Sequence, residues 1–157
     1  MASETWPKSD ACNCLALRQA ARHVTQFYDQ FLAEVGLRTT QFSILAKLRR
    51  LGPLSINALA KELVMDRTTL GRNILPLQRE GLIAVVKGRT DRRSKELQLS
   101  DAGLERLRKG VKGWTEAQAR FETAFGGERT LELRGLLHAV SATDLDGAAR
   151  PVLNQSG

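Results

Sequence analysis

The sequence lacks the long apolar runs and targeting features of membrane and secreted proteins. No segment approaches the roughly 20 apolar residues that span a bilayer, and residues 1–10 have neither a basic start nor an apolar stretch, so we expect no secretory signal. The only cysteines are Cys12 and Cys14, and side chains one residue apart diverge in a helix and rarely bridge each other. We therefore expect a cytoplasmic protein with no membrane partner.

Motifs of the common enzyme classes are missing as well. We find no P-loop, no G-x-G-x-x-G fingerprint, no H-E-x-x-H zinc motif, no serine elbow and no evident nucleophile–base pair. The sequence therefore predicts no catalytic residues and no cofactor. A metal site is not expected either, because Cys12 and Cys14 have only His23 and His138 to join them, without the ligand spacing typical of metal centres.

What the sequence has in excess is positive charge. Lys and Arg total 24 against 17 Asp and Glu, which gives a net charge of +7. Such a balance favours polyanionic partners, of which duplex DNA is the most densely charged. A hydrophobic share of 42% is enough for a buried core. A basic protein without any partner would have the same composition. Only the clustering of the charge along the chain can distinguish it from a protein that binds DNA.

The apolar pattern predicts helices at both ends of the chain. A stripe with three- and four-residue steps runs over 10–35, and Gly36 ends this first helix. Near the other end, Ser100 is expected to cap a long helix. The glycines at 126–127 break it before a last helix over 130–142.

Three shorter helices and a hairpin are predicted between them. Thr39, Ser55 and Asp66 are expected to cap the helices, and Gly52-Pro53 to separate the first from the second. Two short strands follow, over 82–87 and 96–99. The fold class is therefore mainly α with a small β-hairpin wing, which is a winged helix-turn-helix flanked by helices.

The helix after Asp66 has the composition of a DNA recognition helix. Leu70, Ile74 and Leu77 form its inward stripe. The residues expected to face DNA are Arg67, Thr68, Thr69, Arg72 and Asn73. Base contacts usually arise at the N-terminal end of such a helix, and arginine and asparagine can grip guanine and adenine edges bidentately. An ordinary solvated helix face is the alternative.

The hairpin tip concentrates cations on one narrow projection. Its DNA-binding candidates are Arg89, Arg92 and Arg93, with Lys87 and Lys95 nearby. These charges repel one another in isolation and are stabilised beside a phosphate backbone or in a narrow minor groove. Asp91 would be repelled by DNA, so we expect it to pair with a neighbouring arginine and shape the tip. A plain charged turn is the alternative, but helix, helix and basic wing in this order favour DNA binding.

The middle of the chain resembles MarR-type transcriptional regulators. The stretch DRRSKELQLSDAG over 91–103 is similar to the family's wing signature, in which D-x-R precedes an alternating strand, a Ser or Thr, and a glycine. Residues 39–45 resemble its second helix, 59–63 its third, and 68–83 its recognition helix and the entry into the wing. Pro76 departs from many members' recognition helices, which affects the bend and the base contacts.

The resemblance implies a homodimeric repressor that blocks promoter access, with terminal helices that interlock and one wing and recognition helix in each half-site. Arg93 would be the wing arginine and Asp91 its structural partner. The apolar surface of the last helices also favours self-association, and two-fold symmetry then calls for a pseudo-palindromic operator on double-stranded DNA. The expected organisation is a flexible N-terminus (1–9), a helical dimerisation region (10–36 and 104–145), the winged helix-turn-helix domain (37–103) and a disordered tail (146–157).

The sequence is less informative about what controls the protein. Regulators that it resembles respond to small aromatic acids or oxidants. Arg18, Arg22 and His23 are candidates to hold a carboxylate ligand, and surface arginines with a boundary histidine are the alternative.

Cys12 and Cys14 are candidates for oxidant sensing, because a helix N-terminus lowers the pKa of a thiol. Two buried or idle cysteines are the alternative. An alternative of another class is a winged-helix protein-interaction module without DNA binding, which the arginine tip opposes.

Overall fold

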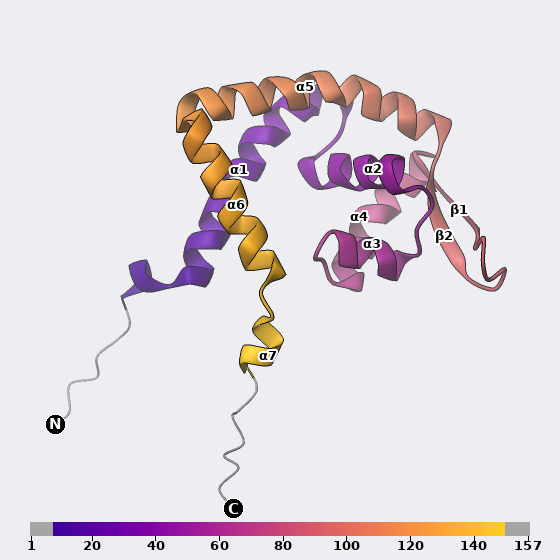
Figure 1. Ribbon diagram of the computed structural model, residues 1–157. Helices are drawn as coiled ribbons and strands as arrows, with labels where there is room; N and C mark the ends of the chain where they lie inside the picture. The colour runs from indigo at the N-terminus through magenta and orange to yellow at the C-terminus, as the bar shows by residue number, and fades with distance from the viewer. Residues whose placement is uncertain (1–7, 150–157) are drawn as a thin grey trace, which may run out of the picture. The chain divides into compact units, whose positions relative to one another are not determined.

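The computed structural model describes residues 8–149 and is mainly helical (Figure 1). Its elements are η1 (Ser9–Ala11), α1 (Asn13–Leu32), η2 (Ala33–Val35), α2 (Thr39–Leu51), α3 (Ile56–Glu62), α4 (Arg67–Arg79), β1 (Ile83–Lys87), β2 (Lys95–Leu99), α5 (Asp101–Phe125), α6 (Gly127–Ala142) and α7 (Leu145–Ala149). The chain forms two compact units that divide within α5, between Gln118 and Ala119. Among residues 8–149, no helix combines the length and apolar character that crossing a bilayer requires.

The core of the first unit lies among α2, α3, α4 and the hairpin. Leucines from each of these helices are almost fully enclosed, such as Leu48, Leu59, Leu70 and Leu77. Each buried leucine side chain contributes about 1.5–3 kcal/mol relative to an exposed one. The inward faces of these helices therefore hold α4 by its apolar side and leave its polar side to solvent.

The hairpin β1–β2 is antiparallel, with Ile83 opposite Leu99 and Lys87 opposite Lys95. Leu54, in the α2–α3 connection, adds a one-residue third strand: its N–H donates to the Leu97 carbonyl at 3.1 Å, and the Leu97 N–H donates back at 2.7 Å. This bridge attaches the middle of β2 to the α2–α3 connection.

Three predicted helix caps are confirmed. Ser55 Oγ accepts the Ala58 N–H at 3.1 Å, Asp66 Oδ1 accepts the Thr69 N–H at 2.8 Å, and Ser100 Oγ accepts the Gly103 N–H at 3.0 Å. Each bond satisfies one of the backbone donors that the first turn of a helix leaves free.

The predicted cap of the second helix is wrong. Arg38 occupies the N-cap position, and Thr39 is the first helical residue. The N–H and hydroxyl of Thr39 both donate to Asp29 Oδ1 on α1 at 2.7 Å. The cap of α2 is therefore supplied by another helix, a contact that local sequence does not reveal.

Other boundaries shift by a few residues. The first helix ends at Leu32 and continues as the 3-10 turn η2, after which Gly36 takes a left-handed conformation with φ 68°. The last long helix begins at Gly127 rather than at residue 130, because only Gly126, with φ 100°, leaves the helical region. The expected tail contains α7 up to Ala149. Residues 1–7 and 150–157 of the two expected terminal segments lie outside the described residues.

Helices α1 and α5 meet within the first unit, where the C-terminal part of α1 reaches α5 (Figure 1). The Tyr28 hydroxyl donates to Gln118 Oε1, and a β-carbon at Gly113 would overlap the Phe31 carbonyl. In the second unit, Arg129 lies 4.3 Å from the centre of the Phe125 ring. Gly113 thus allows α1 to approach α5 closely, and the Tyr28–Gln118 hydrogen bond joins the two helices.

Candidate nucleic-acid interface

The exposed face of α4 carries the residues that the sequence nominates for DNA contact. Arg67, Thr68, Thr69 and Arg72 are exposed, and Asn73 is half-buried. The opposite face is buried in the core, as the apolar stripe predicts. The amphipathic division of this helix therefore places its polar side chains in solvent, where a duplex could reach them.

Hydrogen bonds order the first turn of α4. The Thr69 hydroxyl donates to Asp66 Oδ2 at 2.6 Å, and its N–H donates to Oδ1. These bonds from Thr69 lower the pKa of the Asp66 carboxyl below its usual value. The cap is therefore charged at neutral pH. Because the folded pKa is depressed, the stability that it contributes is present above the unfolded pKa and is lost as pH falls through the folded value.

The same contacts limit what two side chains can offer a base. The Thr69 hydroxyl hydrogen is used by Asp66, so its oxygen remains as an acceptor. Asn73 Nδ2 donates to the Thr69 carbonyl at 2.9 Å, which leaves its Oδ1 and one amide hydrogen. Arg72 is exposed and has the longest reach of the three. We therefore rank Arg72 first of these three for base contact.

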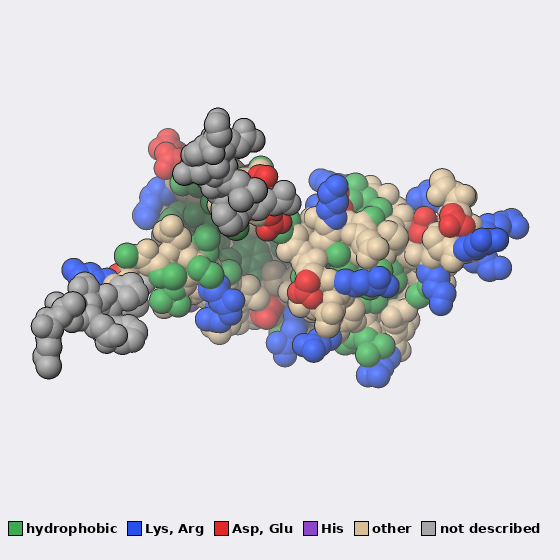
Figure 2. All heavy atoms as spheres, turned by 90° about the horizontal axis from the view of Figure 1, so that it is seen from below, with side chains coloured by type: hydrophobic (Ala, Val, Ile, Leu, Met, Phe, Trp, Pro, Cys, Tyr) green, Lys and Arg blue, Asp and Glu red, His purple; other side chains and the backbone are tan. Residues whose placement is uncertain are grey.

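The hairpin tip exposes Arg92 and Arg93, which we call the tip arginines. Figure 2 shows Lys and Arg side chains gathered at the end of the molecule where Figure 1 has the hairpin tip. Asp91 Oδ1 accepts the backbone N–H of Arg93 at 2.9 Å, and the Asp91 carbonyl accepts the Ser94 hydroxyl at 2.7 Å. Asp91 therefore shapes the turn through the backbone, and these bonds leave the Arg93 guanidinium uninvolved.

Arg89 has a different environment from the tip arginines. Its Nη2 donates to the Pro53 carbonyl at 3.4 Å, and its Nε lies 3.8 Å from Glu96 Oε2. The side chain is 68% exposed, so these contacts are weak and the charge remains accessible. Pro53 is 36 residues away from Arg89 along the chain, so no local sequence pattern indicates this contact.

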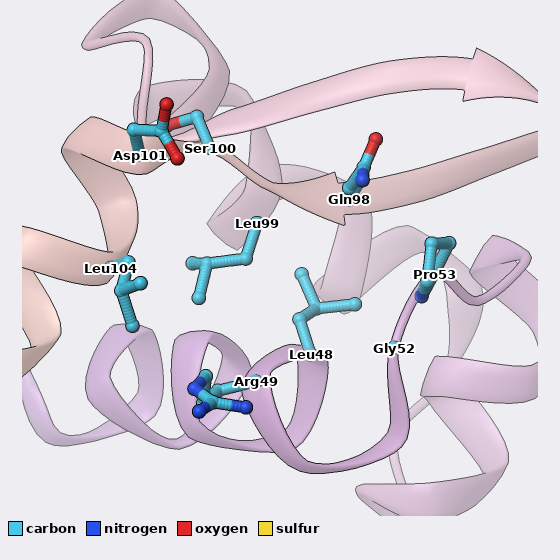
Figure 3. A pocket seen from close by; sticks show the side chains of 9 residues that line it. All are labelled: Leu48, Arg49, Gly52, Pro53, Gln98, Leu99, Ser100, Asp101 and Leu104. Atoms are coloured by element: carbon cyan, nitrogen blue, oxygen red, sulfur yellow. The ribbon is translucent and has the colours of Figure 1, made fainter.

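The candidate ligand residues Arg18, Arg22 and His23 are all exposed on α1. An open hollow of about 210 Å³ lies elsewhere in the first unit, where Leu48, Leu99 and Leu104 face one another from α2, β2 and α5 (Figure 3). None of the three candidates lines it. The structure thus does not bring them into this hollow.

Cys12 and Cys14 are free and exposed, so the alternative of buried cysteines is wrong. Cys12 is the N-cap of α1, and its sulfur accepts the Leu15 N–H at 3.4 Å. Cys14 follows in the first turn of the helix. Both thiols are therefore open to a soluble oxidant.

Comparison with known proteins places these features in a family. Residues 37–95 match the sequence profile of the MarR family. The crystal structure of the M. tuberculosis transcriptional regulator MosR is 33% identical, with a TM-score of 0.73 over 87% of this chain and 100% of that one. MosR in complex with DNA is 35% identical, with a TM-score of 0.70 over 83% and 97%. The HTH-type transcriptional regulator PecS of Dickeya dadantii (strain 3937) is 29% identical over 115 residues, which cover 71% of this chain and 69% of PecS.

Proposed function

Because this chain belongs to the MarR family of DNA-binding transcriptional regulators, we propose that it binds a pseudo-palindromic operator as a homodimer and represses transcription there. One observation carries the proposal: the polar face of α4 and the tip arginines are exposed on the same compact unit. A helix that fits a major groove and a basic hairpin that fits a minor groove are the two parts that such binding needs.

Each residue on this surface has a proposed role. Arg72 reads a base edge in the major groove. Thr68 and Arg67, at the start of α4, lie beside the DNA backbone. The tip arginines enter the minor groove or neutralise phosphates. Asp91 holds the turn, and Arg89 stays near Pro53 and adds positive charge to the flank of the wing. This division follows from exposure and from the hydrogen bonds already given.

The homodimer is supported by the apolar surface of α6. Leu131 and Leu136 are 65% and 66% exposed, and Leu137 and Val140 are exposed as well. Four large apolar side chains on one helix of 16 residues favour association, because burial removes them from water. A second copy of the chain is the occupant that we propose, and a closed two-fold pair would present two copies of α4 to DNA.

Selection of bound duplexes from a random pool tests the function. We expect a pseudo-palindromic sequence to be enriched, and its affinity to fall steeply with salt, with a slope of about −0.9 in log K against log salt for each neutralised phosphate. Sedimentation of the free protein should give a dimer. Failure to enrich any duplex, with little binding at any salt concentration, would support the protein-interaction module instead.

Two signals could release the operator. A small aromatic or acidic ligand would use the cations of α1, Arg18 and Arg22, with His23. The exposure of Cys12 and Cys14 favours a second candidate, an oxidant. A thiolate of either residue would attack hydrogen peroxide to form a sulfenic acid, with water as the other product after protonation. Oxidation at Cys12 would also alter the sulfur that caps α1.

Peroxide treatment tests the second signal. We expect it to weaken binding of the wild-type dimer to the selected duplex by about fivefold or more, the lower range of allosteric coupling. The Cys12→Ser, Cys14→Ser double variant should keep full affinity after the same treatment. Fluorescence anisotropy measures the affinity, and mass spectrometry locates the oxidised residue. An equal loss in the double variant would rule out these thiols as the sensor.

A further inference from the structure

Arg106 of α5 joins three elements of the first unit through one guanidinium nitrogen. Its Nη1 donates to the Val35 carbonyl at 3.1 Å and lies 3.2 Å from Glu80 Oε2. Val35 is the last residue of η2, and Glu80 is the C-cap of α4. We call this set of contacts the Arg106 junction. It connects the end of the candidate recognition helix to α5 and to the α1–α2 connection.

The junction places the Arg106 cation beside one carboxylate and one backbone carbonyl oxygen. A carboxylate at the C-terminal end of a helix is unfavourably placed with respect to the helix dipole, and a cation there offsets it. The Val35 carbonyl precedes Gly36, whose φ of 68° turns the chain away. A β-carbon at Gly36 would lie 3.4 Å from Arg106 Nη1, in ordinary van der Waals contact, so the guanidinium lies directly against this turn.

A second attachment holds the same end of α4 to the beginning of α5. The Ser100 hydroxyl donates to the Gly81 carbonyl at 2.6 Å, and the Ser100 N–H donates to the Leu82 carbonyl at 3.1 Å. The residues that follow α4 are thus attached at Ser100, and Glu80 is attached at Arg106. Two attachments at different points along α5 restrict the direction of α4 more closely than packing against the core and a single attachment would.

We propose that Arg106 is a positioning residue for DNA recognition, which fixes the angle of α4 relative to α5 without contacting DNA itself. The inference rests on the proposed function of α4. Sequence-specific contacts depend on this angle because each side chain must lie opposite the base edge that it recognises. Non-specific contacts to phosphates do not need it to the same degree.

The exposure of the ion pair makes this role separable from folding. The side chains of Arg106 and Glu80 are 31% and 47% exposed. Ion pairs of this exposure contribute little to global stability. Loss of the pair should therefore leave the protein folded while α4 gains freedom.

Arg106→Gln tests the proposal, with Arg108→Gln as the matched control. Arg108 lies on the same helix, is 68% exposed, and pairs with Glu105 on the neighbouring turn at 3.9 Å. The probes are the duplex that wild-type protein selects from a random pool and a scrambled duplex of equal length. We expect Arg106→Gln to lower affinity for the selected duplex by about three- to thirtyfold, the range for residues that modulate coupling. Affinity for the scrambled duplex and the salt slope should match those of Arg108→Gln.

Glu80→Gln provides a second, milder variant and should reproduce the loss. The Glu80→Gln, Arg106→Gln double variant should be no worse than Arg106→Gln, because both remove one interaction. Thermal unfolding followed by circular dichroism confirms that each variant folds. Equal affinity of folded Arg106→Gln and wild type for the selected duplex would overturn the inference, as would a reduced salt slope that reveals a phosphate contact. Failure of the wild type to bind any duplex would instead overturn the proposed function.

Discussion

Replacement of Arg93 with alanine is expected to weaken operator binding roughly a hundredfold, because each copy in the proposed dimer loses one charged hydrogen bond to DNA. The slope of log K against log salt should become shallower by about two, since each lost phosphate contact contributes about 0.9. The fold should survive, because the Asp91 carboxylate binds the backbone N–H at position 93, which alanine keeps. Titration of the selected duplex at several salt concentrations measures both quantities.

Arg72→Ala should be compared with Arg93→Ala, because it distinguishes a base contact from a phosphate contact. Arg72 lies on the exposed face of α4, so we expect its loss to relax sequence preference at one base pair by about 1–3 kcal/mol. A uniform loss over all sequences would make Arg72 a phosphate contact. Unchanged affinity of a folded Arg93→Ala dimer would remove the hairpin tip from the DNA interface.

The features predicted best from sequence are those fixed by neighbouring residues. Ser55, Asp66 and Ser100 each cap a helix through a donor three residues away, which a local pattern contains. The hairpin was also predicted within one residue at each strand start, because β-branched residues and a polar turn are local signals as well. The family resemblance added the assembly of these parts into a winged helix-turn-helix.

The features that were missed depend on contacts between distant segments. The cap of α2 comes from Asp29 on another helix, and Arg89 contacts Pro53 across 36 residues. Arg106 meets Val35 across 71 residues. No periodicity or capping rule relates such pairs, because only the packing of separate elements in the folded unit brings them together. The roles of side chains at the site were therefore less predictable than the elements that carry them.

The second large effect is a loss of stability, which we expect when the glycine at the end of the wing signature is replaced. Gly103 lies in the first turn of α5, where a β-carbon would overlap the Leu82 carbonyl and lie 2.7 Å from Leu99 Cδ1. We expect Gly103→Ala to lower the free energy of unfolding by about 1–3 kcal/mol, the usual cost of overpacking. Denaturant unfolding of the full chain measures it.

Gly71→Ala is the matched control, because Gly71 lies within α4 and nothing stands within 4 Å of the β-carbon it would gain. Alanine there should stabilise the protein by up to about 1 kcal/mol through helix propensity alone. The same gain in propensity acts at Gly103, so the difference between the two variants isolates the clash with the Leu82 carbonyl. That carbonyl also accepts the Ser100 N–H, and it cannot retreat without breaking the bond that attaches the wing to α5. Equal stability of the two variants would show that α5 can shift away from the hairpin, and the close contact would then not explain why this position holds glycine.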